Sequence, residues 1–208
     1  MAQFFDIHPE HPQPRLVKQA GEIVRGGGLI AFPTDAAYAL GGHTGDVQIL
    51  ERIRRIRGVD DHHLFTLMCR DLSEIATYAR VDNVQYRILK SCTPGSYTFI
   101  LEGSRQLPRR VLHPKRKTIG IRIPDHALSL ALLEALGEPL LVSTLLLPDS
   151  ELPLTDGDEI RQKLERRVDL VIESGRCGVD MTTVIDLTGP APLLIRAGLG
   201  PLAPLGLE

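Results

Sequence analysis

The segment over residues 33–41, Pro-Thr-Asp-Ala-Ala-Tyr-Ala-Leu-Gly, carries a hydroxyl, a carboxylate and a phenol close together. It follows the apolar run at residues 29–32, which is typical of a buried strand, and open α/β sheets bind ligands in the loops after their strands. Thr34, Asp35 and Tyr38 are therefore candidates to hold a small polar ligand. Their spacing alone suits a structural turn with a packed tyrosine even better, because such side chains commonly close turns.

Arginines gather at the end of a predicted helix over residues 46–57. Arg55 and Arg57 fall in its last turn, where the helix dipole favours a cation by about 0.3–1 kcal/mol without any further function. The functional alternative is a guanidinium fork that binds phosphate or carboxylate.

A basic strip over residues 103–124 contains seven cations and no acidic residue. The whole chain carries 24 Lys and Arg against 26 Asp and Glu, so the strip is a local asymmetry. We interpret it as a positive cleft wall that attracts nucleotide phosphates or RNA, with a solvated loop as the alternative. The side chains expected to contact RNA are Arg109, Arg110, Lys115, Arg116 and Lys117.

The elements that must position these residues alternate between helical and strand patterns, which predicts an α/β fold with a largely buried sheet. Helices are expected at residues 14–25, 46–57, 82–90, 126–136 and 158–166, with another beginning at residue 71. Strands are expected at residues 29–32, 65–69, 97–101, 119–123, 140–147, 168–172, 183–187 and 193–196. No repeat or linker divides the chain, so we expect one domain over residues 1–208.

Composition argues against several functional classes. With 43% hydrophobic and 24% charged residues, the chain is an ordinary globular sequence. Its three cysteines are widely spaced and odd in number, which indicates a reducing, cytoplasmic setting. The P-loop, the dinucleotide fingerprint and the nucleophile elbow are missing. We expect no secretory leader, no membrane span and no metal site, since the adjacent His62 and His63 would point apart.

Five segments, in chain order, resemble motifs of the YrdC/YciO family. Residues 32–41 resemble its Pro-Thr-Glu-Thr-x-Tyr-Gly-Leu-Gly motif, and residues 94–98 its Pro-Gly-Pro-x-Thr strand entry. The other three segments resemble Val-x-Val-Arg-x-Pro, Ser-Thr-Val-Val-Asp and the closing Arg-x-Gly, at residues 120–124, 182–186 and 196–198. The YciO branch is the most similar, through residues 65–74 and 115–120.

The resemblance implies a twisted, mostly parallel open sheet, flanked by helices around a large positively charged cavity. In YrdC-type members that cavity makes threonylcarbamoyl-AMP from L-threonine, bicarbonate and ATP, with Mg²⁺ accompanying ATP and pyrophosphate leaving. The product serves the threonylcarbamoyladenosine modification of tRNA. Binding of double-stranded RNA or tRNA is also ascribed to the family. The extra domain of some larger members is not expected here.

The resemblance also implies roles for individual residues. The small substrate would be held by Thr34, Asp35, Tyr38 and Arg122. The ATP or AMP-type nucleotide would be held by Arg55, Arg57, Thr98, Ser143, Thr144, Thr183 and Arg196. Of these, Arg55, Arg57 and Thr144 are the expected catalytic residues.

Two departures from the synthase motifs leave the function open. The family's Lys-x-Arg falls on Arg55-Ile56-Arg57, and its Ser-x-Asn falls on Thr144-Leu145-Leu146, where leucine replaces the amide. Losing an amide that binds nucleotide costs about 1.5–3 kcal/mol, or roughly 10- to 100-fold in rate. We therefore expect either a synthase-like enzyme with weakened activity, or a nucleotide- or RNA-binding protein without efficient catalysis. A purely structural α/β domain is the least favoured alternative, because five motifs keep the family order.

Overall fold

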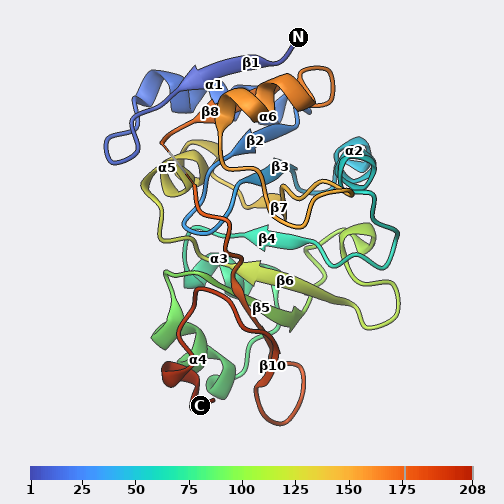
Figure 1. Cartoon of the computed structure of the whole chain (residues 1–208). Helices are drawn as coiled ribbons and strands as arrows, with labels where there is room; N and C mark the ends of the chain where they lie inside the picture. Colours follow the sequence, from blue (N-terminus) through green and yellow to red (C-terminus); the bar gives the residue numbers. More distant parts are fainter. Residues whose placement is uncertain (176, 208) are drawn as a thin grey trace.

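Ten strands form one sheet in the computed structural model, which describes residues 1–175 and 177–207. Figure 1 shows the sheet running from the N-terminal strand at the top to the C-terminal strands at the bottom, in the order β1-β8-β2-β3-β7-β4-β6-β5-β9-β10. The strands are β1 (Gln3–Asp6), β2 (Ile30–Phe32), β3 (Ala39–His43), β4 (Thr66–Met68), β5 (Tyr97–Glu102), β6 (Thr118–Arg122), β7 (Leu140–Thr144), β8 (Leu170–Glu173), β9 (Thr183–Asp186) and β10 (Leu193–Arg196).

Helices flank the sheet and begin where the sequence predicts. They are α1 (Pro14–Arg25), α2 (Val47–Arg57), α3 (Leu72–Tyr78), α4 (Asn83–Cys92), α5 (Ala127–Leu136) and α6 (Gly157–Leu164), with 3₁₀ turns η1 (Arg109–Val111) and η2 (Ala203–Leu205). The carboxylates of Asp46, Asp71, Asp82 and Asp156 each accept a backbone N–H at a helix start, which satisfies donors that the helix leaves free. Within the described residues, no helix combines the length and the apolar character needed to cross a bilayer.

The strand pairing is mixed, so the expectation of a mostly parallel sheet is wrong. Four neighbouring pairs are parallel and five are antiparallel. The main cause is β3, which lies antiparallel to both β2 and β7 and which the sequence analysis treated as part of a ligand loop. The α/β class and the open sheet are confirmed.

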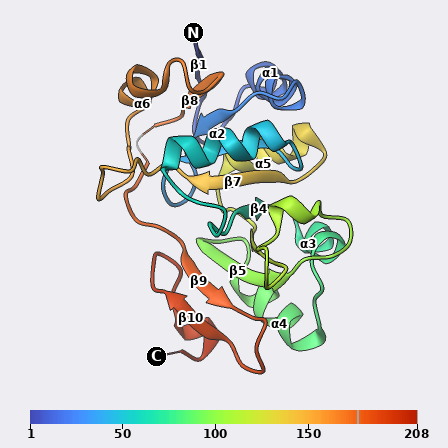
Figure 2. The ribbon, with the colours of Figure 1, turned by 90° about the vertical axis from the view of Figure 1, so that its right-hand side faces the viewer.

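Apolar side chains cover both faces of the sheet. Alternation along β2 sends Ile30 and Phe32 to the layer beneath α1 and α5, and Ala31 to the opposite layer beneath α2 and α6. Figure 1 shows α5 on the left and α2 on the right, and Figure 2 shows α1 on the right and α6 on the left of the upper strands. In the half of the sheet that includes β4, β5, β6 and β9, one face packs on α3 and α4 and the other face is left for a cavity.

Candidate functional site

A cavity of about 540 Å³ lies over the middle of the sheet. It is lined by the segment after β2, by the end of α2 and the loop after it, and by residues of β3, β4, β5, β6, β7, β9 and β10. That volume falls in the usual range for small-molecule sites. Four of its lining residues are arginines, and no carboxylate is among the described residues that line it. The polar lining residues are Thr34, Arg57, His63, Thr66, Thr98, Arg116, Arg122, Ser143, Thr144, Thr182 and Arg196.

Arg57, in the last turn of α2, is anchored to β7. Its Nη1 donates to Ser143 Oγ at 2.8 Å, and its Nε donates to the backbone oxygen of Leu146 at 3.2 Å. Burial, followed by the nearby Arg196 guanidinium, lowers the pKa of Arg57. Two neighbouring guanidinium groups repel each other, and an anion bound between them would relieve that repulsion. The leucine at the position of the family's Asn thus contributes its backbone, and its side chain is not part of the described cavity lining.

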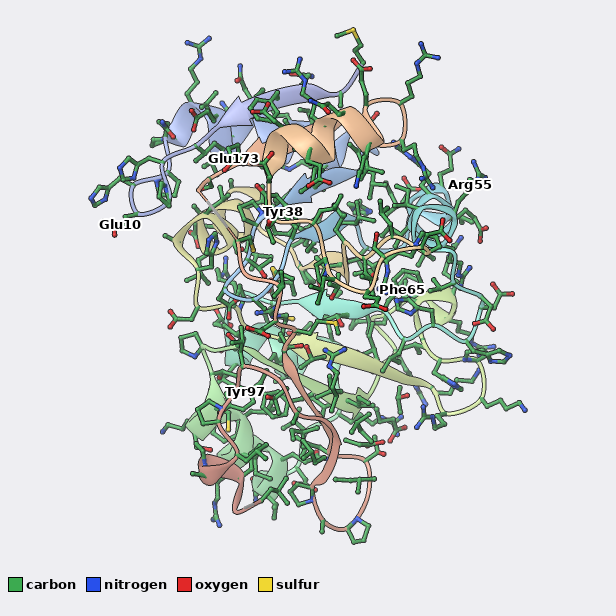
Figure 3. All side chains as sticks on the ribbon, in the orientation of Figure 1. Glu10, Tyr38, Arg55, Phe65, Tyr97 and Glu173 are labelled. Carbon is green, nitrogen blue, oxygen red and sulfur yellow. The ribbon has the colours of Figure 1, made fainter. Side chains whose placement is uncertain are left out.

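Arg55 is not brought to the cavity, so its expected catalytic and nucleotide-binding roles are corrected. It is exposed on the outer side of α2, at the periphery of the molecule in Figure 3. Residues two apart on a helix differ by about 200° in direction, so Arg55 and Arg57 cannot face one ligand. The backbone oxygen of Arg55 accepts from Arg167 Nη2 at 2.8 Å, which connects this turn to the segment between α6 and β8.

Arg122, at the end of β6, forms a buried ion pair with Asp35 from the loop after β2. Both side chains are 7% exposed, and the Asp35 carboxylate also accepts from Ser96 Oγ at 3.0 Å. Burial lowers the pKa of Arg122, and the Asp35 carboxylate opposes that effect. Arg122 lines the cavity, and its Nε has no partner within the part of the chain that the structure describes. Asp35 therefore supports Arg122 from outside the cavity. It was predicted to hold the substrate, but it is not part of the described cavity lining.

Thr34 lines the cavity and also closes a turn. Its hydroxyl donates to the Ala37 oxygen at 2.8 Å and accepts from the Ala36 N–H at 3.1 Å. Thr34 is thus both a turn residue and a residue that can contact a ligand in the cavity.

Tyr38, predicted to hold the substrate, lies instead in the core. It is fully buried, and its hydroxyl is 3.1 Å from Glu173 Oε2 and 3.3 Å from the Ile172 oxygen. Figure 3 shows Tyr38 and Glu173 side by side. Burial, reinforced by the Glu173 charge, raises the pKa of the Tyr38 phenol well above its usual range. Tyr38 is therefore a packing residue with a satisfied hydroxyl.

The β9–β10 end of the cavity corrects the assignment of a threonine. Thr182, not Thr183, lines the cavity, because successive side chains on a strand point to opposite faces. Thr182 Oγ1 lies 2.8 Å from Thr98 Oγ1, and the Thr182 backbone oxygen accepts from Arg196 Nη2 at 2.9 Å. These contacts place Arg196 at the cavity wall, as predicted.

Thr183 supports that wall from behind. Its hydroxyl donates to the Gly200 oxygen at 2.7 Å and accepts from the Gly198 N–H at 3.0 Å. A Cβ at Gly198 would lie 2.2 Å from the Met181 backbone oxygen, so only glycine allows this close approach. The closing Arg-x-Gly motif thus holds β10 against the segment before β9.

The basic strip divides into two parts. Arg116 lines the cavity and lies 3.8 Å from the Asp186 carboxylate, while Arg122 sits at the cavity floor. The remaining cations expected to bind RNA are exposed, outside the described cavity lining, and without an ion-pair partner among the described residues; they are Arg109, Arg110, Lys115 and Lys117. Thr98, Ser143 and Thr144 line the cavity as predicted.

His63 is the main functional candidate that the sequence analysis missed. It lies in the loop after α2, with Nε2 3.0 Å from Ser143 Oγ. Burial, then the charges of Arg57 and Arg54, lower the pKa of His63 to about 4. No local pattern could have revealed it, because its partner on β7 is 80 residues away in sequence.

The arrangement is suited to holding anions. Fixed guanidinium groups and hydroxyls converge on one cavity, where burial strengthens their attraction for phosphate or carboxylate. Among residues 1–175 and 177–207, no group of three or more potential metal ligands occurs.

Comparison with known proteins agrees with the fold and the motifs. Residues 22–198 match the Sua5/YciO/YrdC family model, described as telomere recombination. The uncharacterized protein YciO of Escherichia coli K12 is 55% identical over 204 residues, covering 98% of this chain and 99% of that protein. The crystal structure of E. coli YciO superposes with a TM-score of 0.95, covering 99% of this chain and all of that one.

A more distant relative has a named activity. The threonylcarbamoyl-AMP synthase of Pyrococcus abyssi is 28% identical over 189 residues, covering 89% of this chain and 55% of that protein. A crystal structure of P. abyssi Sua5 complexed with L-threonine shares the fold, with a TM-score of 0.85 at 24% identity, and covers 94% of this chain and 57% of that one.

Proposed function

The chain belongs to the Sua5/YciO/YrdC family, and on that premise we propose that its cavity joins ATP, L-threonine and bicarbonate into threonylcarbamoyl-AMP. One observation carries the proposal: four arginines and six hydroxyl side chains line a single cavity, and no carboxylate is among the described residues that line it. The name of the P. abyssi relative supports the reaction, and its complex with L-threonine supports the amino acid. We further propose that the product serves tRNA modification.

The chemical difficulty of this reaction matches the charges in the cavity. The neutral amine of threonine first forms a C–N bond to the carbon of bicarbonate, a C–O bond breaks, and water leaves to give the carbamate. The carbamate carries a negative oxygen that must attack the α-phosphorus of ATP, which is itself surrounded by negative oxygens. The new carbamate O–P bond forms as the bond to the β-phosphate oxygen breaks, and pyrophosphate leaves with that electron pair. Fixed guanidinium groups reduce the repulsion and orient the attack, and no general base is required.

Individual side chains fit distinct parts of the substrates. Arg57 and Arg196, close enough for one to lower the pKa of the other, are assigned to the phosphates, with Ser143 and Thr144 as hydroxyl partners. Arg122, whose Nε is free of partners in the described structure, is assigned to the threonine carboxylate, with Thr34 beside it. Mg²⁺ would enter with ATP, since it commonly binds through phosphates and retained waters.

A pair of matched variants tests the assignment of Arg57. Arg57→Met removes a charge-assisted contact worth about 1.5–3 kcal/mol, so kcat/KM for pyrophosphate release should fall roughly 10- to 100-fold or more. Arg55→Met removes the same charge from the exposed side of the same helix and should leave the rate within about twofold. Equal rates for the two variants would contradict the proposed site.

The exposed cations of the basic strip favour a second function, namely RNA binding. Four cations without ion-pair partners among the described residues form a surface that suits a phosphate backbone. If tRNA or double-stranded RNA binds here, the affinity should fall steeply with salt, with a slope that decreases by about 1 for each cation removed. Affinity that does not change between about 50 and 200 mM salt would contradict RNA binding at the strip.

A further inference from the structure

His63, Ser143 and Arg57 are connected by hydrogen bonds at the cavity wall. Its Nε2 lies 3.0 Å from Ser143 Oγ, and the same oxygen accepts from Arg57 Nη1 at 2.8 Å. The imidazole ring meets Phe65 edge-on, with ring centroids 5.2 Å apart, which limits its rotation. Three side chains from α2, the loop after it and β7 are therefore held in one arrangement.

The donor and acceptor groups of Arg57, Ser143 and His63 determine where the protons lie in these two hydrogen bonds. A guanidinium group only donates, so Ser143 Oγ must accept from Arg57. Ser143 is 5% exposed, and its described partners are Arg57 and His63 alone. Among the described residues, His63 Nε2 is the acceptor within reach of the Ser143 proton. We therefore assign His63 as the neutral tautomer that accepts at Nε2 and carries its proton on Nδ1.

Protonation of His63 would reverse the direction of this hydrogen bond. An imidazolium donates from both nitrogens, so His63 would then donate to Ser143 Oγ. The Ser143 hydroxyl, already accepting from Arg57, would turn its proton away from His63. Ser143 lines the cavity, so an anion bound there is the acceptor that this proton would find.

The charges around His63 make its protonation depend on an anion. The groups that face it from the packed elements are Arg54 and Arg57 on α2, and Asp60 on its own loop beside His62. β7 contributes only hydroxyls, and the same cavity is lined by Arg116, Arg122 and Arg196. Burial and the charges of Arg57 and Arg54 lower the pKa of His63 to about 4. A phosphate on Arg57 would offset those charges and favour the imidazolium.

We propose that His63 is a positioning residue that sets the direction of the Ser143 hydroxyl and takes up one proton when a phosphate group enters the cavity. The inference rests on the proposed function, because it requires phosphate binding at Arg57. The proton comes from solvent and is bound at Nε2, and no other bond is made or broken. Phosphate affinity should consequently rise as pH falls.

Calorimetry with inorganic pyrophosphate, in two buffers of different ionisation enthalpy, measures this uptake. If bound phosphate restores an ordinary pKa near 6.5, binding at pH 6 takes up about 0.7 proton at His63. His63→Gln keeps an acceptor toward Ser143 but cannot take a proton, so it is the matched control. Subtracting its uptake removes the proton exchange of pyrophosphate itself. Between pH 8 and pH 5.5, wild-type affinity should rise about tenfold more than that of the variant.

Two further readouts complete the test. Imidazole ¹⁵N chemical shifts of the empty protein at pH 7 should show neutral His63 with its proton on Nδ1. His63→Phe should weaken pyrophosphate binding at pH 8, whereas His63→Gln should retain it within about threefold; thermal melting of both variants checks folding. Equal proton uptake by wild type and His63→Gln, or a proton on Nε2, would overturn the inference and leave the proposed function intact. Failure of wild type to bind pyrophosphate at all would overturn both.

Discussion

Asp35→Asn tests whether the cavity floor is built on a buried charge pair. Asp35 faces Arg122, both side chains are 7% exposed, and Arg122 Nε has no partner in the described part of the chain. Asparagine has nearly the same shape as aspartate. Its amide oxygen can still accept from Arg122, and its amide nitrogen can donate to Ser96 Oγ, whose own proton can go to the backbone oxygen of residue 35 at 3.1 Å. The substitution therefore removes the charge and little else.

The expected cost follows from leaving one charge alone. Removing one partner of a buried pair typically destabilises a protein by about 3–5 kcal/mol, because the remaining ion stays desolvated. Since asparagine preserves the hydrogen bonds, we expect the lower end, about 3 kcal/mol. Burial already lowers the pKa of Arg122, and the Asp35 carboxylate is the group that opposes this effect.

Urea denaturation measures the change in unfolding free energy, with two controls. The double variant Asp35→Asn/Arg122→Met contains no buried charge and should recover part of the loss. Glu102→Gln breaks an exposed ion pair with Arg80, at 2.8 Å, and should cost less than about 1 kcal/mol. A loss below about 1 kcal/mol for Asp35→Asn would refute the buried pair.

Three other outcomes are expected. Tyr38→Phe should cost about 1.5–3 kcal/mol in urea denaturation, because it removes a buried hydrogen bond to the Glu173 carboxylate; no change would mean that this bond is not formed. The pKa of His63 is lowered to about 4 in the folded protein. As pH falls from 6.5 to 4, the unfolded protein therefore takes up a proton at His63 that the folded protein does not, and wild type should lose up to about 3 kcal/mol of stability. That pH dependence should be smaller in His63→Gln, and identical curves would contradict the shift. Gly198→Ala should displace the segment that carries Arg196, which would lower the free energy of unfolding by about 1–3 kcal/mol and weaken pyrophosphate binding in titrations. Unchanged binding would show that Gly198 does not position Arg196.

Local signals in the sequence predict most of the fold. The capping residues Asp46 and Asp71 and the short apolar runs of the strands each leave a signal within a few residues. Strand β3 left none, because Gly41 and Gly42 are poor strand formers. It becomes a strand only because β2 and β7 pair with it from both sides, and a Cβ at Gly41 would lie 2.7 Å from Phe32.

The candidate site was predictable where a motif carries its residue to a strand or helix end. Arg57, Arg122 and Arg196 reach the cavity as expected. The errors arose from direction rather than position: Arg55 is two residues from Arg57 but faces solvent, and Thr183 is adjacent to Thr182 but faces the opposite side. Such distinctions depend on which face packs, which a single motif does not specify.

His63 illustrates what sequence could not supply. Its imidazole acquires its environment from Ser143, which is distant in the chain and reaches it only through the sheet. The leucine that replaces the family's Asn was visible in the sequence, but its surviving contribution, a backbone oxygen bound by Arg57, was not.

Pyrophosphate release from ATP, with L-threonine and bicarbonate each present or omitted, decides whether the cavity is a synthase site. We predict release that requires both, slowed by roughly 10- to 100-fold relative to relatives that keep the Asn. Release of no pyrophosphate under any combination, from protein that binds ATP, would contradict the synthase and leave nucleotide binding as the function of the cavity.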